Sequence, residues 1–372
     1  MKQWHSSHSI FISRCFWDYY LHVFQKLYAL ELAKKHESRV TWFDPPTRNP
    51  LTWFKERKRS IDGITVRRPF SLRNEYERFR KSDRLLFNTQ LRTSLHSDQK
   101  PDLWSIACAH PWLSRTDWFA KSLYWPGDYF NAKKEFVEYK NYDLVMPWSS
   151  REITNIPKKF DGIPFLSSTC AGHAFTNYDH AKPKLGFFDE HKQFKKFIIY
   201  IGGLSIDRID FKLLEKLAKS LPDHALLMGA KHDGHDNSLR AIRKLTSLPN
   251  IYLFEDLDYA RLAELTHCAD VCIIPYKTSG FNAGCCPNKL FEYSAMGKFI
   301  VSTAIPSIDA YSKIISIASN ADEFIQLVRQ KASKKPSIQQ RGKLLEMARF
   351  ASPEATLVRI GRAFDLTSKK KP

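Results

Sequence analysis

The sequence SGFNAGCCPNKLFEYSAMGK, residues 279–298, is the most informative stretch of the chain for its fold. A loop of small residues leads into an apolar segment near Pro287, and proline is favoured in the first turn of a helix. Gly297 follows this segment at the position where helices commonly end in a left-handed residue. The stretch therefore predicts a loop and then a helix over residues 287–296, an arrangement in which free backbone N–H groups bind an anion.

Two charged residues lie in the first turns of this expected helix. Lys289 is unfavourable at the positive end of a helix dipole, which indicates that it meets an anion there. Glu292 comes three residues later and shares the same face. A carboxylate one turn below a phosphate site can accept hydrogen bonds from both hydroxyls of a ribose. The alternative is a solvated Lys–Glu pair on an ordinary helix, since short motifs of this kind often occur by chance.

The flanking sequence alternates apolar strands with helical segments. In the C-terminal half a very apolar strand at residues 197–201 runs into a glycine pair, and the alternation continues to residue 302. The N-terminal half shows the same pattern, with expected strands at residues 8–13, 39–43, 103–109, 122–125 and 142–147. Strands that alternate with helices predict parallel, doubly wound sheets. In such sheets ligands bind beyond the carboxyl ends of the strands.

Composition excludes several classes of protein. The chain has 372 residues and is 43% hydrophobic, which is enough for two packed cores and excludes wholesale disorder. No apolar run reaches the length of about 18 residues that a membrane-spanning helix needs, and the N-terminal residues do not have the pattern of a secretory signal. The seven cysteines are odd in number and fit no zinc spacing, so we expect a reduced, cytoplasmic protein.

The net charge of +19 and the pI of about 9.5 favour polyanionic partners. Residues 55–84 hold eleven Lys/Arg and five acids, interleaved with aromatic residues. We expect this segment to face an anionic membrane surface, where each basic residue gains about 1 kcal/mol, although a solvated face is the alternative. Nucleic-acid binding would also suit the charge. It is less favoured because no nucleic-acid-reading module is visible and the basic residues do not form a tract.

Two separated motifs resemble those of GT-B glycosyltransferases. FIIYIGGL (residues 197–204) resembles their strand and glycine loop, and PNKLFEYSAMGK (residues 287–298) resembles their P-x-K-x-x-E-Y-x-A-x-G-K segment. Between them, residues 248–276 are similar to the nucleobase side of the family's site. The likeness is strongest to bacterial cell-envelope polysaccharide enzymes of the teichuronic-acid type and to the xanthan glucuronosyltransferase group. It covers residues 197–302 well and the N-terminal half loosely.

This resemblance implies an α/β protein with the GT-B fold, two Rossmann-like doubly wound domains that face each other across a cleft. The N-terminal domain, residues 1–180, would bind the acceptor. The C-terminal domain, residues 181–350, would bind the nucleotide-sugar donor. A C-terminal helix in residues 351–372 would pack back on the N-terminal domain.

The resemblance also implies roles for individual residues of the donor site. Glu292 would hold the ribose hydroxyls and Lys289 would contact the diphosphate. Arg208 stands where many retaining members place a diphosphate-binding lysine. The backbone around Phe254 and Glu255 would lie beside the base. The glycines that let the donor phosphates approach the backbone would be Gly202 and Gly203.

Departures from the retaining pattern favour an inverting mechanism. Gly284 stands where retaining members carry the first glutamate of E-x7-E, and Gly203 stands where they carry arginine. Asp128, in SLYWPGDYFN, matches the catalytic base of the xanthan-type inverting enzymes, although an aspartate after Pro-Gly is also a common turn residue. His110 and His173 are weaker candidates for substrate contact, and a role as ordinary loop histidines is the alternative.

The sequence thus predicts a nucleotide-sugar-dependent hexosyltransferase of cell-envelope or exopolysaccharide synthesis. Its acceptor would be lipid-linked or an oligosaccharide, and it would lie peripherally on the inner face of the cytoplasmic membrane. We expect no permanently bound cofactor and no metal, because KHDGHD (residues 231–236) is more typical of a solvated loop than of a metal site. The alternatives are a nucleotide-sugar epimerase on the same fold and, less favoured, a basic nucleic-acid-binding protein.

Overall fold

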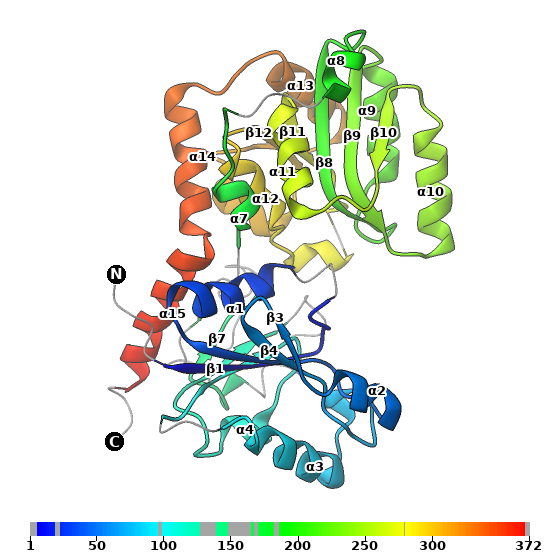
Figure 1. Ribbon diagram of the computed structural model, residues 1–372. Coiled ribbons are helices and arrows are strands. Elements are labelled where there is room, and N and C mark those ends of the chain that lie inside the picture. The colour runs from blue at the N-terminus through cyan, green and yellow to red at the C-terminus, as the bar shows by residue number, and fades with distance from the viewer. Residues whose placement is uncertain are drawn as a thin grey trace. The chain divides into compact units, whose positions relative to one another are not determined.

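The computed structural model describes residues 6–18, 23–95, 99–126, 139–147, 165–166, 170–181, 186–278 and 280–368. The chain divides into two compact units (Figure 1). The N-terminal unit comprises Met1–Ser168 together with Pro353–Pro372, and the C-terminal unit is Thr169–Ser352. The division falls earlier in the chain than the boundary that we expected after residue 180. Within the described residues, no helix is both long and apolar enough to cross a membrane.

The N-terminal unit is built on a seven-stranded sheet with the order β3-β4-β2-β1-β5-β6-β7. All neighbouring pairs are parallel except β3 and β4, which form a hairpin. Its two-residue turn, Asp62 and Gly63, has positive φ at both positions, as a hairpin turn that follows the twist of its strands requires. The strands are β1 (His8–Ser13), β2 (Arg39–Phe43), β3 (Arg59–Ile61), β4 (Ile64–Arg67), β5 (Asp102–Ile106), β6 (Ser122–Trp125) and β7 (Leu144–Val145).

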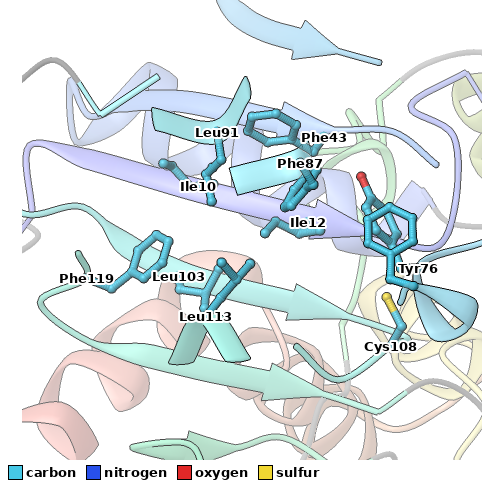
Figure 2. Packing of buried hydrophobic residues seen from close by; sticks show 11 residues of the cluster. Ile10, Ile12, Phe43, Tyr76, Phe87, Leu91, Leu103, Cys108, Leu113 and Phe119 are labelled. Carbon is cyan, nitrogen blue, oxygen red and sulfur yellow. The ribbon is translucent and has the colours of Figure 1, made fainter. Parts of the chain in front are cut away.

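Helices cover this sheet and its edges. They are α1 (Val23–Lys35), α2 (Pro50–Glu56), η2 (Tyr76–Arg78), α3 (Lys81–Arg92), α4 (Pro111–Ser114) and α15 (Pro353–Ser368). On one face Phe87 and Leu91 of α3 pack against Ile10 and Leu103, residues of β1 and β5 (Figure 2). Complete burial of such a side chain contributes about 1.5–3 kcal/mol. The C-terminal helix α15 contacts α1 and β7, so the end of the chain completes the N-terminal unit.

The C-terminal unit is built on a six-stranded, all-parallel sheet with the order β10-β9-β8-β11-β12-β13. The chain runs outward from β8 to β10 on one side and from β11 to β13 on the other. The direction of winding therefore reverses between β8 and β11, and such a reversal point is where open α/β sheets bind ligands. The strands are β8 (Lys196–Leu204), β9 (His224–His232), β10 (Ile251–Phe254), β11 (Val271–Ile274), β12 (Phe299–Thr303) and β13 (Ser316–Ala318).

Several helices of this unit begin at polar caps. Asp210, Asp258 and Asn320 each accept a hydrogen bond from a backbone N–H of the helix that follows them. The helices are α7 (His173–Thr176), α8 (Gly186–Glu190), α9 (Phe211–Ser220), α10 (Asp236–Thr246), α11 (Tyr259–Cys268), η4 (Gly280–Gly284), α12 (Lys289–Ala295), η5 (Pro306–Tyr311), α13 (Ala321–Ala332) and α14 (Ile338–Phe350). All residues of α12 are buried.

Two details differ from the expectations drawn from the sequence. The expected helix over residues 287–296 begins two residues later, at Lys289, and ends as expected before Gly297, whose φ is +61°. The polar residues 176–196, whose composition is typical of an interdomain linker, contain α8. The Phe187 ring of this helix lies 5.1 Å from the rings of both Tyr252 and Phe254, so α8 belongs to the C-terminal unit.

Candidate functional site

The reversal point of the C-terminal sheet brings Gly202 and Lys289 together. Gly202 lies near the carboxyl end of β8, and its φ of +122° lies in the region that favours glycine. A Cβ at this position would lie 3.1 Å from Lys289 Nζ and 3.2 Å from Lys289 Cε. A side chain at position 202 is therefore disfavoured both by backbone strain and by space. Because Gly202 has no side chain, the ammonium group of Lys289 can approach the end of β8.

Lys289 is enclosed by aromatic side chains. It is only 8% exposed. Its ammonium group donates a hydrogen bond to the hydroxyl of Tyr276, and it lies 4.6 Å from the ring centroid of Tyr276 and 5.2 Å from that of Tyr200. Cation–π contacts of this kind stabilise a cation that has lost most of its hydration. The two tyrosines therefore hold the positive charge of Lys289 at the point between β8 and β11 where the winding of the sheet reverses.

A second cation lies on Tyr276. The guanidinium of Arg208, in the loop after β8, is 5.5 Å from the Tyr276 ring centroid, and its Nη1 donates to the Sγ of Cys285 at 3.4 Å. The fully buried Asn282 fixes this loop, because its Nδ2 donates to the carbonyls of Arg208 and Lys277 at 2.8 and 2.9 Å. Tyr276 thus contacts both cations, a feature suited to an anion with more than one negative charge.

Glu292 lies on α12 one turn after Lys289, and only 7% of it is exposed. The hydroxyl of Tyr259, the first residue of α11, donates a hydrogen bond to Glu292 Oε1. Burial raises the pKa of the Glu292 carboxyl to about 7, against the opposing effects of the Tyr259 hydrogen bond and the Lys289 charge. The carboxyl group can therefore change its protonation state near neutral pH.

Tyr259 is positioned by the short helix α7. A Cβ at Gly172, which precedes α7, would lie 2.1 Å from Tyr259 Cε1, so only glycine fits there. The Phe175 ring meets the Tyr259 ring edge-on at 5.1 Å. His173 is the first residue of α7, and α7 contacts both α11 and α12. The structure therefore places this predicted residue on an element that packs beside Glu292.

The expected base-side residues lie at the ends of the neighbouring strands. Phe254 is the last residue of β10, and the loop after it leads directly into α11 and Tyr259. Gly203 is the register partner of Lys231 on β9, and Lys231 Nζ lies 3.3 Å from Asp256 Oδ1 in that loop. The donor-site residues that we predicted thus lie at the carboxyl edge of one sheet or on α12 beside it.

His110 lies in a different unit from the predicted donor-site residues. His110 belongs to the N-terminal unit and is fully buried, with its Nδ1 3.2 Å from Ser105 Oγ and its Nε2 3.5 Å from Cys108 Sγ. Burial lowers the pKa of His110 to about 3. His110 is therefore a neutral residue of the core. We had expected it to contact the substrate. Asp128 lies outside the described residues.

Three tyrosines, Tyr200, Tyr259 and Tyr276, were missed by the sequence reasoning. Tyr200 does carry a signal, because it precedes Gly202 by two residues and so points to the same face of β8. Tyr276 follows β11 at the carboxyl edge, where ligand contacts are expected. The contact between Tyr259 and Glu292 joins residues 33 positions apart, and no local pattern marks it.

Residues 231–236 form hydrogen bonds with one another and with the first turn of α10. His232 Nδ1 accepts from Gly234 N at 3.1 Å, and Asp233 accepts from His235 N and from Ser238 Oγ, each at 3.0 Å. In the part of the chain that the structure describes, no three His, Cys, Asp or Glu side chains are grouped so that they could hold a metal ion.

Comparison with protein families identifies the C-terminal unit. The family described as "Glycosyl transferases group 1" matches residues 195–332, which include both cations and Glu292. This match covers most of the C-terminal unit and shows what that unit is similar to. A Bacillus subtilis protein named as a teichuronic acid biosynthesis glycosyltransferase, TuaH, is 33% identical over 115 residues. That match covers 31% of this chain and spans 28% of the relative's length.

Solved structures similar to the whole chain show its fold. The N-terminal domain of trehalose-6-phosphate phosphatase from Candida albicans matches with a TM-score of 0.71 and 12% identity over 98% of both chains. Sucrose-phosphate synthase from Thermosynechococcus elongatus matches with a TM-score of 0.67 and 12% identity over 100% of both. WaaG, a glycosyltransferase of lipopolysaccharide biosynthesis, matches with a TM-score of 0.59 and 11% identity over 94% of this chain and 98% of its own. The expected GT-B fold is confirmed, and so is the resemblance to GT-B glycosyltransferases.

Proposed function

We propose that this protein transfers a sugar from a nucleoside-diphosphate donor to a lipid-linked or oligosaccharide acceptor in cell-envelope polysaccharide synthesis. The observation that carries the proposal is the pair of cations on Tyr276, with the carboxyl group of Glu292 one turn away. A nucleoside diphosphate presents the complementary groups, a diphosphate and a ribose diol. The group 1 domain and the name of the Bacillus relative support the same class of reaction.

In the proposed reaction the acceptor hydroxyl oxygen attacks the anomeric carbon of the donor sugar. The bond from that carbon to the diphosphate oxygen breaks, and its electron pair stays on the diphosphate. Lys289 and Arg208 offset the charge that develops there, so we propose that neither a metal nor a permanently bound cofactor is needed. Asp128 accepts the proton of the acceptor hydroxyl. Since position 284 is glycine, no carboxylate stands where retaining members place one, and we propose inversion.

Nucleotide binding tests the proposal most directly. UDP or GDP should raise the unfolding temperature of the full-length protein, whereas oligonucleotides of similar charge should not. A screen of nucleotide sugars for nucleotide release should then identify the donor. An epimerase would interconvert nucleotide sugars without an acceptor and without releasing nucleotide, and that result would replace the proposal.

Donor affinity is expected to rise as the pH is raised through about 7. Only the ionised carboxyl of Glu292 can accept hydrogen bonds from both ribose hydroxyls, and its pKa is raised to about 7. Below that pH the proton must be displaced, so affinity should fall by up to about tenfold per pH unit. Calorimetry between about pH 6 and about pH 8 measures the donor affinity. An intact nucleotide sugar is the ligand, because its diphosphate diester does not titrate in this range. Glu292→Gln should flatten the profile, and a flat wild-type profile would contradict the assignment.

We also propose that the protein associates peripherally with an anionic membrane, at the inner face of the cytoplasmic membrane. Helix α2 supports this, because it buries none of its residues and exposes Leu51 and Phe54 by 75% and 65%. Lys55, Arg57 and Lys58 flank these side chains and are exposed. Apolar side chains ringed by basic residues suit the interface of an anionic bilayer. Other basic residues in residues 55–84 form ion pairs within the protein. Arg59, for example, lies 2.7 Å from both Asp18 and Asp44.

Binding to anionic vesicles should weaken with salt and with loss of these charges. Neutralising Lys55, Arg57 and Lys58 together should remove about 1 kcal/mol per residue, which is about fivefold for each. Vesicle sedimentation at several salt concentrations measures the effect. The matched control neutralises three exposed lysines of the C-terminal unit, Lys334, Lys335 and Lys343, and should retain binding. Vesicle binding that is absent, or insensitive to salt, would count against the membrane proposal.

A further inference from the structure

The N-terminal unit contains a pocket of about 370 Å³ that the proposed donor site does not use. It lies between α2, α3 and the ends of β2 and β4. The aromatic rings of Phe43 and Trp53 form part of its wall. Among the described residues, all of its charged lining residues are cationic; they are Arg57, Lys58, Arg67 and Arg68.

The pocket lies at the edge of the sheet where a ligand is expected. Phe43 and Arg67 are the last residues of β2 and β4, and they are register partners in this parallel pair. The pocket therefore lies beyond the carboxyl ends of two parallel strands, as the donor site does in the other unit. A second pocket of about 390 Å³ shares Arg68 and includes Arg14, which follows β1. This second pocket also includes Glu75, so its lining is of mixed charge, and the excess of cations is confined to the first pocket.

Two of the arginines are held in place away from bulk water. The guanidinium of Arg67 lies 5.7 Å from the Phe43 ring centroid and donates to Ser94 Oγ. Burial lowers the pKa of Arg67, and the charge of Arg39 lowers it further, so the site would gain from an added negative charge. The Arg68 side chain is 17% exposed, and its Nη1 lies 2.5 Å from Glu56 Oε2. Its Nε is buried and has no hydrogen-bond partner within the described part of the chain.

We infer that this pocket binds a phosphate ester of the acceptor, an inference that rests on the proposed transferase function. Glu56 offsets one of the four cations, and the excess that remains favours a multiply charged anion such as a diphosphate over a single carboxylate. The ring of Trp53 offers an apolar surface to the sugar or chain that the phosphate carries. A soluble sugar phosphate and a phospholipid-type headgroup share this chemistry.

Inorganic pyrophosphate is a suitable probe for the pocket. We would titrate it calorimetrically into the full-length protein in just enough UDP to fill the proposed donor site, because excess UDP would present a diphosphate to the pocket as well. Arg67→Gln, Arg68→Gln and Thr93→Phe should each weaken binding by about tenfold or more, since each removes a charge-assisted contact or fills the space. Lys289→Ala should leave pyrophosphate binding unchanged. So should Arg115→Gln, which alters an exposed arginine of the same unit that bonds to Asn141.

The outcomes separate the pocket from the donor site. Thr93→Phe keeps every cation, so it tests the pocket even if an arginine variant fails to fold. Pyrophosphate binding that is absent, or equally tight in all three pocket variants, overturns the inference. If UDP does not bind, the proposed function fails, while pyrophosphate titrated alone into wild type and Thr93→Phe still tests the pocket.

Vesicles distinguish the two sources of the phosphate ester. If it belongs to a lipid, Arg68→Gln and Thr93→Phe should lower binding to phosphatidic-acid vesicles by severalfold. If it belongs to a soluble sugar phosphate, they should lower only the affinity for pyrophosphate. The double variant Leu51→Ser, Phe54→Ser changes exposed residues of α2 and should lower vesicle binding alone, leaving pyrophosphate affinity intact.

Discussion

Asp128→Asn is expected to lower kcat by about 10²–10⁴-fold, the usual contribution of a general base. Asparagine keeps the size of the side chain and much of its hydrogen bonding but cannot accept the acceptor proton. Nucleotide affinity should not change, because the proposed contacts of the nucleotide, with Arg208, Lys289 and Glu292, lie in the C-terminal unit. Steady-state kinetics at saturating donor and calorimetry with the nucleotide measure the two quantities separately.

The stereochemistry of the product completes this test. Direct attack by an acceptor hydroxyl that Asp128 deprotonates inverts the anomeric carbon, which NMR of the product reports. Asp117→Asn, at an exposed aspartate of the same unit, is the matched control and should leave the rate unchanged. A retained anomeric configuration, or a near-normal rate for Asp128→Asn, would leave Asp128 as a turn residue after Pro126-Gly127.

Glu292→Ala should weaken donor binding by about 1.5–3 kcal/mol, the contribution of a hydrogen bond to a charged group. The fold should survive the change. Burial raises the pKa of Glu292 from 4.5 to about 7, so the ionised carboxyl disfavours the folded state, and stability due to this group falls as the pH rises from 4.5 to 7. Removing the carboxyl removes that cost but leaves the Tyr259 hydroxyl without its acceptor. Calorimetry with the nucleotide measures affinity, and thermal unfolding checks the fold.

Two further variants show whether the loss belongs to the ribose contact. Tyr259→Phe keeps the carboxyl and removes only the hydroxyl that bonds to it, so nucleotide binding should be retained. Glu346→Ala changes an exposed glutamate on α14 and should have no effect. Unchanged nucleotide affinity in Glu292→Ala would refute the assignment, whatever its stability.

The order of elements around the donor site could be predicted because it depends on local pattern. The apolar run before Gly202 predicted β8, and Gly297 predicted the end of α12. Other elements escaped prediction. The β3–β4 hairpin has strands of three and four residues, which are too short to show a clear alternation, and its stability comes from pairing with β2. Helix α8 is only five residues long, and its Phe187 finds its partners in β10.

In the candidate site, too, some positions could be predicted from the sequence and others could not. The spacing of Lys289 and Glu292 predicted that both lie on one face of one helix, and the structure places both on α12. His110 shows the limit of such reasoning, because its position at the end of a strand resembles that of a ligand-binding residue. Its burial comes from neighbours elsewhere in the sequence, such as Tyr76, whose ring centroid lies 5.1 Å away.

By itself the sequence determined the alternating pattern, the glycine pair at the end of a strand, and the types of residue that a nucleotide site needs. Hydrophobic periodicity, helix termini and charge are local properties, so they can be read along the chain. Only the tertiary structure decided that Lys289 fits against Gly202, that Tyr276 contacts two cations, and that Tyr259 meets Glu292. These contacts join residues from different strands and helices, and the order of the strands in the sheet decides which of them meet.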